Sequence, residues 1–254
     1  MGDFLKNLRL ALSFLTRLPG GIHPANQSDL GSSVPWFPVI GVLIGLISGS
    51  FFWVLILFMP PLVASVLAIG FSILVTGAFH EDGLADTFDS FGAFNAERRL
   101  EIMKDSRIGT FGTLALLINV ALSVAALTSL EGEEGFLAII LAHTLSRVAS
   151  IIVLTTVKPA KQEGLGVSYS LFSSRLKVLL VASFFVLLSS SVGLFGLISS
   201  VAILLIAFCS KSIAVSKFGG TTGDFLGAVQ QIANATVLVI ASATFSNEIA
   251  LWLI

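Results

Sequence analysis

The stretch VLLVASFFVLLSSSVGLFGLISSVAILLIAFCS, residues 178–210, contains no charged side chain. A helix needs about 20 apolar residues to cross the roughly 30 Å hydrocarbon core of a bilayer. The stretch is too long for one span, so it predicts two, with the turn at Gly193 and Gly196. Residues 178–210 therefore indicate a membrane-spanning helical fold.

Composition extends this interpretation to the whole chain. Of 254 residues, 55% are hydrophobic and 11% are charged, and the mean hydropathy is +0.98. Soluble proteins carry roughly 25% charged residues, so a soluble fold of this length is excluded. The net charge of −1 gives no reason to expect a nucleic-acid partner. We expect a single integral-membrane domain over residues 1–254.

The other apolar runs complete an all-α, polytopic bundle of about seven transmembrane helices. Pro60 and Pro61 make the first hairpin tight, because proline cannot continue a helix interior. No internal repeat is evident. The expected spans are residues 36–58, 62–79, 110–130, 136–157, 178–194, 196–210 and 235–254.

The N-terminus predicts an additional helix that lies in the membrane interface. Phe4, Leu8, Leu12 and Leu15 recur at helical spacing among basic residues, which is typical of an interfacial amphipathic helix. Arg17 interrupts the apolar run and no small-residue cleavage site follows, which argues against a signal peptide. The single cysteine, Cys209, lies in an apolar run and is expected to be inert packing.

The distribution of basic residues predicts the orientation. With the N-terminus inside, the inner segments are 1–35, 80–109, 158–177 and 211–234. They hold every lysine and arginine except Arg147, which lies inside a span. Because inner loops of membrane proteins are enriched in lysine and arginine, we expect a cytoplasmic-membrane (inner-membrane) protein whose functional loops face the cytoplasm.

Charge is concentrated in residues 80–107, HEDGLADTFDSFGAFNAERRLEIMKDSR. Asp82, Asp86 and Asp89 share one face of a helix because their spacing is i, i+4, i+7. Three neighbouring carboxylates repel one another, and an oxygen-only ligand set favours Mg²⁺ or Mn²⁺ over zinc. Gly83 allows a ligand or another backbone to approach closely. The alternative to a metal site is that residues 80–107 form a solvated loop with surface salt bridges.

The rest of this stretch predicts a second half of the site. Glu101 and Asp105 form another i, i+4 carboxylate pair, with Lys104 and Arg107 beside them. Carboxylates that hold metal next to cations that hold phosphate oxygens are typical of phosphoryl transfer. The turn at residues 109–112 opens the next span, and its amides could add to an anion site. Glu97, Arg98 and Arg99 are interpreted as ordinary loop charges.

Two further elements lie outside this stretch. Arg147, one turn from His143, is an intramembrane arginine, which faces a cavity or a partner by default. It is expected either to bind a substrate phosphate or to pair with Asp86 or Asp105. The motif GGTTGDFLG, residues 219–227, could cradle phosphate through its glycine amides, with Asp224 as a further metal ligand. It lacks the P-loop lysine pattern.

Together these residues resemble the cobalamin synthase (adenosylcobinamide-GDP ribazoletransferase) family. The resemblance rests on HEDGLADTFD (80–89), IMKDSRIGTFG (102–112), GGTTGDFLGA (219–228) and FLTRLP (14–19), with WFP (36–38) and Gly41 downstream. It runs from residue 4 to about 230. It implies that adenosylcobinamide-GDP and α-ribazole, or its 5′-phosphate, are joined to give adenosylcobalamin, or its phosphate, and GMP, with Mg²⁺ as cofactor.

The roles expected from the residues and the resemblance together are as follows. The metal ligands are Glu81, Asp82, Asp86, Asp89 and Asp224. The catalytic set is Asp82, Asp86, Asp89 and Asp105, with Asp89 or Asp105 as the acceptor of the hydroxyl proton. Substrate phosphate is bound by Lys104, Arg107, Arg147, Gly220 and Gly223.

Other interpretations stay open at this point. The aspartate spacing is distantly similar to that of CDP-alcohol phosphotransferases of lipid synthesis, although their arginine-containing signature is absent. A secondary transporter ranks last, because its ionisable groups would lie near the bilayer midplane. Cobalamin synthases often carry an acidic residue near position 231, where this chain has Gln231. A homo-oligomer is compatible with the sequence.

Overall fold

The computed structural model describes residues 2–20, 27–160, 168–170 and 173–245. The described chain forms one 3-10 turn, η1 (Val34–Trp36), and a series of α-helices. These are α1 (Gly2–Leu15), α2 (Gln27–Ser33), α3 (Phe37–Ile56), α4 (Pro61–Thr76), α5 (Phe79–Ser90), α6 (Ala96–Ile102), α7 (Thr110–Thr128), α8 (Gly132–Thr156), α10 (Arg175–Ser190), α11 (Gly193–Phe218) and α12 (Gly223–Phe245).

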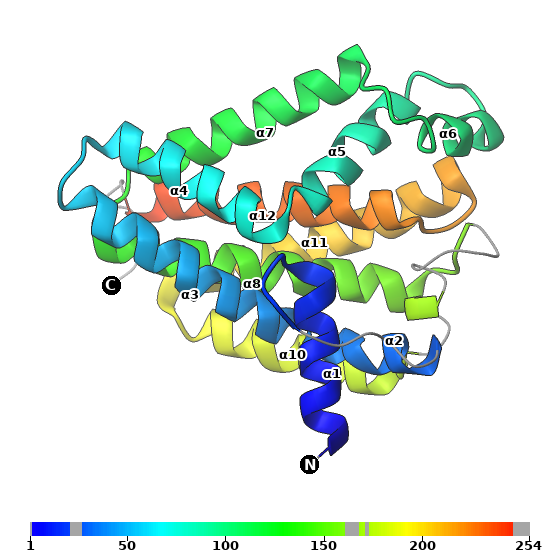
Figure 1. The fold of residues 1–254 in the computed structure, drawn as a ribbon, viewed down its shortest axis with the longest axis horizontal. Coiled ribbons are helices and arrows are strands. Elements are labelled where there is room, and N and C mark those ends of the chain that lie inside the picture. Colours follow the sequence, from blue (N-terminus) through cyan, green and yellow to red (C-terminus); the bar gives the residue numbers. More distant parts are fainter. Residues whose placement is uncertain (1, 21–26, 161–167, 171–172, 246–254) are drawn as a thin grey trace.

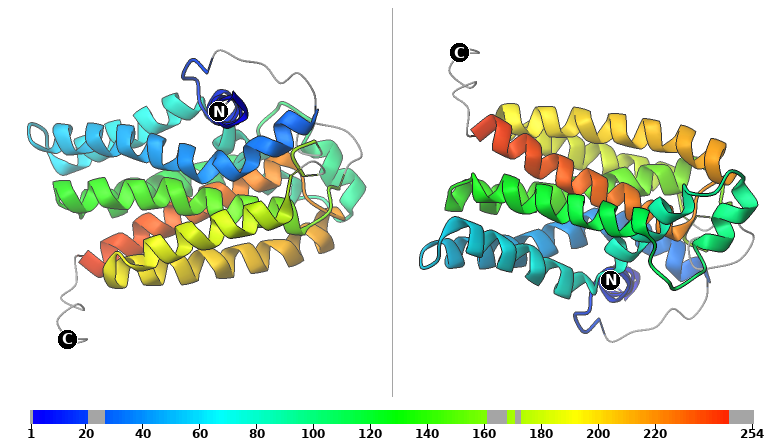
Figure 2. Two further views of the ribbon diagram at one scale, coloured as in Figure 1. Left: turned by 90° about the horizontal axis from the view of Figure 1, so that it is seen from below. Right: turned by 90° about the horizontal axis from the view of Figure 1, so that it is seen from above.

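The helices form a bundle around α8, which contacts α3, α10, α11 and α12 (Figures 1 and 2). Most of α8 is buried inside the protein, whereas only 22% of the most apolar stretch of α7 is buried. Large apolar side chains such as Leu74, Leu187 and Phe208 are exposed on the outer helices. An apolar exterior is what a lipid environment requires, so the all-α membrane fold is confirmed.

Glycines set the closest helix contact, between α3 and α8. Gly41, Gly45 and Gly49 recur every four residues on α3. A Cβ on Gly41 or Gly45 would lie 2.5 Å from the α8 backbone, at the carbonyl oxygen of His143 or the Cα of Ile140. Small residues at this spacing let helix backbones approach, which is how helices associate in membranes.

Within the described residues, five helical segments are long and apolar enough to cross a membrane, or six if the bent pair α4–α5 counts as one span. The expected count of seven is therefore not confirmed. One reason is length, since α10 has 16 residues, about 24 Å at 1.5 Å per residue. The expected turn in residues 178–210 is confirmed: Ser191 and Val192 separate α10 from α11, and Gly193 has a φ of 71°.

The expected boundaries of the last span and of the loop before it are wrong. The helix expected to start at residue 235 starts at Gly223, and α11 continues to Phe218. Residues 211–234, expected as an inner loop, are thus helical except for 219–222. The polar residues near the start of α12 led the hydropathy pattern to place the span too late. Cys209 is exposed and does not pack against the protein core.

A sharp break after α4 places the acidic helix. Gly77 and Ala78 both have left-handed φ values, 70° and 57°, and α5 is turned by 92° from α4. Arg17 follows α1 and lies against this break, where its amide donates to the carbonyl of Val75 at 2.8 Å. In Figure 1, α5 runs away from α4 across α12 toward α6. The break therefore carries the acids of α5 out of the line of α4.

The N-terminal segment forms the expected helix, and its apolar face packs on the protein. Leu15 is buried, and Leu8 and Leu12 pack against the same core. The ring of Phe4 lies 4.4 Å from that of Trp36. Part of the face predicted to enter the interface thus covers the start of α3.

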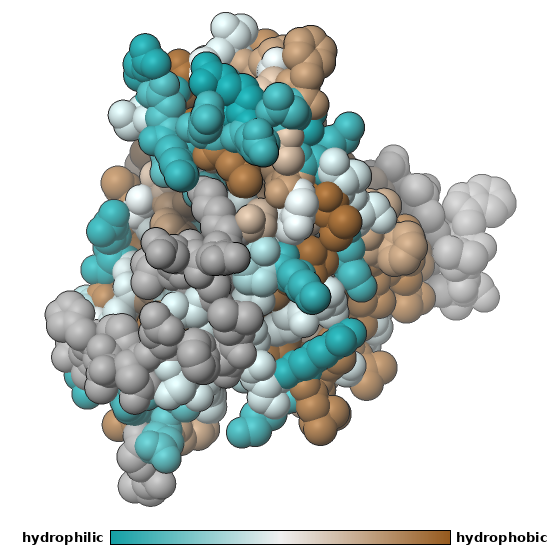
Figure 3. Space-filling model, turned by 90° about the vertical axis from the view of Figure 1, so that its right-hand side faces the viewer, coloured by the Kyte–Doolittle hydropathy of each residue, from teal (hydrophilic) through white to brown (hydrophobic). Residues whose placement is uncertain are grey.

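The basic segments gather at one end of the bundle. Pro159 and Thr221 form an isolated bridge, and Arg99 Nη1 donates to the carbonyl of Lys217 at 3.1 Å. Figure 3 looks onto this end and shows hydrophilic side chains gathered there, densest at the height of α6. In the described parts of the structure, segments 80–109, 158–177 and 211–234, expected from the charge count to lie on one side, therefore contact one another at this end.

Candidate active site

The candidate site is built where α5 crosses the first turns of α12. Gly83 makes the crossing possible: a Cβ there would lie 2.7 Å from the carbonyl oxygen of Asp224 and 3.0 Å from its Cα. On the other side, a Cβ on Gly227 would lie 3.3 Å from the carbonyl oxygen of His80. The expectation that Gly83 admits another backbone is confirmed, and that backbone carries Asp224.

The crossing brings four carboxylates into electrostatic contact. Asp82 and Asp86 lie on α5, and Asp224 lies on the first turn of α12. Partial burial, followed by the charges of Asp82, Asp224 and Asp89, raises the pKa of Asp86 to about 7. Because neighbouring negative charges favour protonation, Asp86 is kept fully ionised at neutral pH only if a cation compensates those charges. This oxygen-only donor set fits a hard divalent cation.

The side chains do not converge on a single point in this arrangement. Among the residues that the structure describes, no three His, Cys, Asp or Glu side chains lie close enough together to hold one metal ion. The predicted ligand set therefore remains a prediction. Its support is the repulsion among the acids and the chemistry of their oxygens.

Asp89 caps α7. Its Oδ2 accepts a hydrogen bond from the amide of Gly109 at 2.7 Å, and its Oδ1 accepts one from the amide of Gly112 at 2.8 Å. The amides expected to bind a substrate anion thus bind Asp89, because the first amides of a helix lack partners within the helix. The expected metal and proton-accepting roles of Asp89 gain no support from this geometry.

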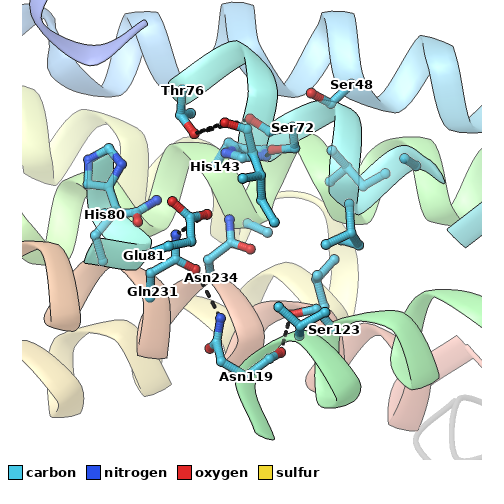
Figure 4. Close-up of a pocket in the computed structure, with 18 residues that line it drawn as sticks. Ser48, Ser72, Thr76, His80, Glu81, Asn119, Ser123, His143, Gln231 and Asn234 are labelled. Atoms are coloured by element: carbon cyan, nitrogen blue, oxygen red, sulfur yellow. Dashed lines mark hydrogen bonds between the residues drawn. The ribbon is translucent and has the colours of Figure 1, made fainter. Parts of the chain in front are cut away.

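Glu81 faces a different part of the molecule. Its Oε1 accepts a hydrogen bond from Gln231 Nε2 at 2.8 Å, and Gln231 Oε1 accepts one from Asn119 Nδ2 at 3.0 Å. The three side chains line an interior cavity (Figure 4). The structure therefore separates Glu81 from the expected metal set, and the unexpected Gln231 is its hydrogen-bond donor.

The second acidic pair does not form as expected. Helix α6 ends at Ile102, so Glu101 and Asp105 are not on one continuous helix. Asp105 makes an ion pair with Arg107, and Glu101 makes one with Arg98 at 2.8 Å. Hydrogen bonds from Arg107 lower the pKa of Asp105 to about 2. A carboxylate with so low a pKa is a poor proton acceptor, which argues against Asp105 as the base.

Arg147 is buried, with 1% of its surface exposed. Its Nη1 donates to the carbonyl of His143 at 2.9 Å and to His143 Nδ1 at 3.2 Å. Because a guanidinium only donates, His143 Nδ1 accepts, and Nε2 carries the proton that is donated to Ser72 Oγ at 2.9 Å. No ion pair between Arg147 and Asp86 or Asp105 is found among the described residues, so the expected pairing is not supported.

The glycine-rich segment does not form a phosphate cradle at its first residues. The amides of Gly219, Gly220 and Thr221 donate to the carbonyls of Val215, Ala214 and Lys158, respectively. The expected phosphate-binding role of Gly220 is therefore not supported, because its amide is used within the fold. Gly223 is exposed at the start of α12, next to Asp224, and its expected role remains a prediction.

Several polar residues of the interior were not singled out from the sequence. Ser72, Asn119, Gln230 and Asn234 all line the interior cavity with Glu81. A signal was present, because uncharged polar residues inside otherwise apolar spans are usually turned toward the protein interior. Serines and amides recur in many spans, however, and only the packing shows which of them meet.

Comparison with known proteins gives one consistent family. The sequence profile of the cobalamin-5-phosphate synthase family matches residues 7–242. An adenosylcobinamide-GDP ribazoletransferase of Shewanella amazonensis is 38% identical over 98% of this chain and 100% of that protein. Proteins with the same name from Bradyrhizobium diazoefficiens and Acetivibrio thermocellus are 36% and 35% identical, over 95% and 93% of this chain and 95% and 97% of theirs.

No solved structure matches this chain. The family assignment therefore rests on sequence, and the sequence matches span every helix from α1 to α12. The crossing of α5 and α12 and the charged end lie within the matched region. The chain belongs to the cobalamin-5-phosphate synthase family.

Proposed function

We propose that this chain is a membrane transferase that joins adenosylcobinamide-GDP to α-ribazole, or its 5′-phosphate. The products are adenosylcobalamin, or its phosphate, and GMP. The observation that carries the proposal is the family match over residues 7–242, together with relatives named adenosylcobinamide-GDP ribazoletransferase that align over nearly the whole chain. The acids at the crossing of α5 and α12 supply groups suited to this chemistry.

The reaction breaks a phosphoanhydride bond and forms a phosphate ester bond. A ribose hydroxyl oxygen of α-ribazole, one that is still free when the 5′ position carries a phosphate, forms a bond to the cobinamide-side phosphorus, and the bond from that phosphorus to the bridging oxygen of GMP breaks. The hydroxyl proton passes to a carboxylate at the α5–α12 crossing. Asp86 is one candidate for this carboxylate, because partial burial and the neighbouring acids raise its pKa to about 7 in the absence of a cation, and a proton acceptor works best with a pKa near the working pH.

The same crossing is the proposed place of Mg²⁺. Asp82, Asp86 and Asp224 would hold it, since their charges act on one another across the helix contact. When bound, the cation would neutralise charge that develops on the phosphate oxygens. In the absence of a cation these acids repel, and their repulsion is the support for this part of the proposal.

Arg147 supports binding of the substrate's diphosphate. Its Nε and Nη2 have no hydrogen-bond partner among the described residues, and a buried charge without a partner is costly. An anion that accepts from both atoms removes this cost. Lys104 is exposed just after α6, at the end of the bundle where the basic segments gather. We propose that it adds a second positive charge to the site.

We propose that the enzyme lies in the cytoplasmic membrane and that the end of the bundle with the basic segments faces the cytoplasm. The support is the charge distribution, since Arg147 is the only one of 14 lysines and arginines outside the expected inner segments. A nucleotide-linked substrate would meet the acids of α5 from that side.

The test is GMP release by the purified protein in lipid vesicles. We expect release from adenosylcobinamide-GDP that requires both α-ribazole and Mg²⁺. Asp82→Asn and Asp86→Asn should each lower the rate by about 10³-fold, equivalent to about 4 kcal/mol of transition-state stabilisation. Glu97→Gln, on an exposed residue of α6, is the matched control. Near-normal rates in both aspartate variants, or release of CMP from a cytidine donor instead, would contradict the proposal.

A further inference from the structure

A polar cavity lies inside the bundle, apart from the acids at the α5–α12 crossing. Side chains from α3, α4, α5, α7, α8 and α12 line it (Figure 4). Its volume is about 30 Å³. Since one water molecule needs roughly 10–15 Å³ of such space, the cavity has room for about two.

Polar atoms that lack partners line this cavity. In the described part of the chain, Ser48 Oγ, His80 Nδ1, Glu81 Oε2, Gln230 Oε1 and Asn234 Nδ2 are buried without a hydrogen bond. Each of these residues lines the cavity. A buried polar group without a hydrogen-bond partner destabilises a fold, and the surrounding lipid cannot supply the missing partner. Five such atoms around one space point to an occupant.

The neighbouring hydrogen bonds fix these side chains in place. Asn119 donates to Gln231, which donates to Glu81 Oε1, so Glu81 Oε2 is left for the cavity. Gln230 Nε2 donates to Ser146 Oγ at 3.2 Å, which leaves Gln230 Oε1. The free atoms of Glu81 and Gln230 therefore belong to side chains whose other polar atom is already hydrogen-bonded within the fold.

The chemistry of the free atoms identifies the occupant. Glu81 Oε2 and Gln230 Oε1 accept, Asn234 Nδ2 donates, and Ser48 Oγ can do either. A water molecule can hydrogen-bond to both donors and acceptors, whereas a metal ion would bind only the acceptor atoms.

We propose that this cavity is an internal water site, which holds about two ordered water molecules between Glu81, Gln230, Asn234 and Ser48. The water completes the hydrogen bonds of side chains from three helices, α3, α5 and α12. The inference does not depend on the proposed transferase activity, because it concerns the fold alone.

The first test compares two serines. Ser48 and Ser199 are both fully buried, and neither Oγ has a partner in the described structure, but only Ser48 lines the cavity. Removing a buried hydroxyl that has no hydrogen-bond partner and no bound water is neutral or stabilising. Ser199→Ala should therefore keep the apparent Tm unchanged or raise it. Ser48→Ala should lower the apparent Tm by about 2–4 °C, because a bound water loses a partner. An equal or higher Tm for Ser48→Ala than for Ser199→Ala overturns the proposal.

The second test examines the occupant directly. A high-resolution structure of the full chain in lipid should show about two density peaks within hydrogen-bond distance of Glu81 and Asn234. Replacing NaCl by KCl or choline chloride at constant ionic strength should leave the apparent Tm unchanged. An empty cavity, or a Tm that rises with one particular cation, contradicts a water site.

Discussion

At the residue scale, environment divides the acids that look alike in the sequence. Asp89 binds two helix amides, Asp105 is paired with Arg107, and Glu81 accepts from Gln231. Among the described residues Asp86 has no ion pair and caps no helix, and the charges of Asp82, Asp224 and Asp89 act on it. The acids therefore differ in what they bind, and only Asp82, Asp86 and Asp224 at the α5–α12 crossing remain candidates for a cation site.

Asp86 predicts a pH dependence of stability when no divalent cation is present. Its pKa in the folded protein, about 7, is above the ordinary value of about 3.9. Between these values the folded state binds more protons than the unfolded state, so stability rises as the pH falls from about 8 toward 4. In EDTA, the apparent Tm should be higher at pH 6 than at pH 8, and Asp86→Asn should reduce this difference. Mg²⁺ should raise the Tm at pH 8. If Mg²⁺ does not change the apparent Tm at pH 8, the proposed cation site is contradicted.

Arg147 predicts opposite effects on stability and activity. Replacement of an uncompensated buried charge by an apolar side chain is often neutral or stabilising, so Arg147→Met should keep or raise the apparent Tm. The same change should lower GMP release by about 100-fold or more, the scale for loss of a charged contact to a phosphate. Arg98→Met, which breaks an exposed ion pair with Glu101, should change neither quantity measurably. Full activity in Arg147→Met would exclude a role in substrate binding.

At the element scale, the decisive contact is the crossing of α5 and α12. Helix α5 exists as a separate element because the chain turns at Gly77 and Ala78. Gly83 then allows α5 to lie directly against the backbone of Asp224. The relative position of the two helices, more than any single loop, places the acids together.

Gly83→Ala should disturb this crossing. The added methyl group would meet backbone atoms of Asp224, which cannot rotate away, so we expect a loss of about 1–3 kcal/mol in stability. GMP release should fall as well, because α12 moves away from Asp82 and Asp86. Gly70→Ala on α4 is the matched control: its Cβ would meet nothing within 4 Å, and it should gain roughly 0.5–1 kcal/mol. Equal effects of the two substitutions would show that the crossing is not tightly packed.

At the scale of the whole molecule, an apolar exterior surrounds a polar end and a polar interior. The exposed leucines and phenylalanines of the outer helices suit lipid, and the basic segments meet at one end. Cys209 is the only cysteine, so cysteine labelling can report the topology once it is replaced.

We predict the topology from single cysteines in a Cys209→Ser background. With the N-terminus inside, Glu133→Cys at the start of α8 should react with a membrane-impermeant maleimide in intact spheroplasts. Glu97→Cys on α6 should react only after the membrane is permeabilised. Both positions are exposed, so access of the reagent depends on the side of the membrane alone. The reverse pattern would mean that the candidate site faces outward.

The sequence by itself determined the membrane class, the helical architecture, the family and the identity of the acidic helix. Each of these depends on composition or local spacing: 11% charge, long apolar runs, and carboxylates at i, i+4 and i+7. The placement of the last span failed because hydropathy cannot distinguish a polar helix start, such as residues 223–234, from a loop.

Only the tertiary structure decided which acids share a site. Asp89 and Asp105 carry the same charge as Asp82 and Asp86, but they are bound by helix amides and by Arg107. The interior cavity likewise joins side chains 150 residues apart, such as Glu81 and Gln231. The physical reason is that the environment of an ionisable or polar group depends on which helices pack around it. Packing is a long-range property that local sequence spacing does not encode.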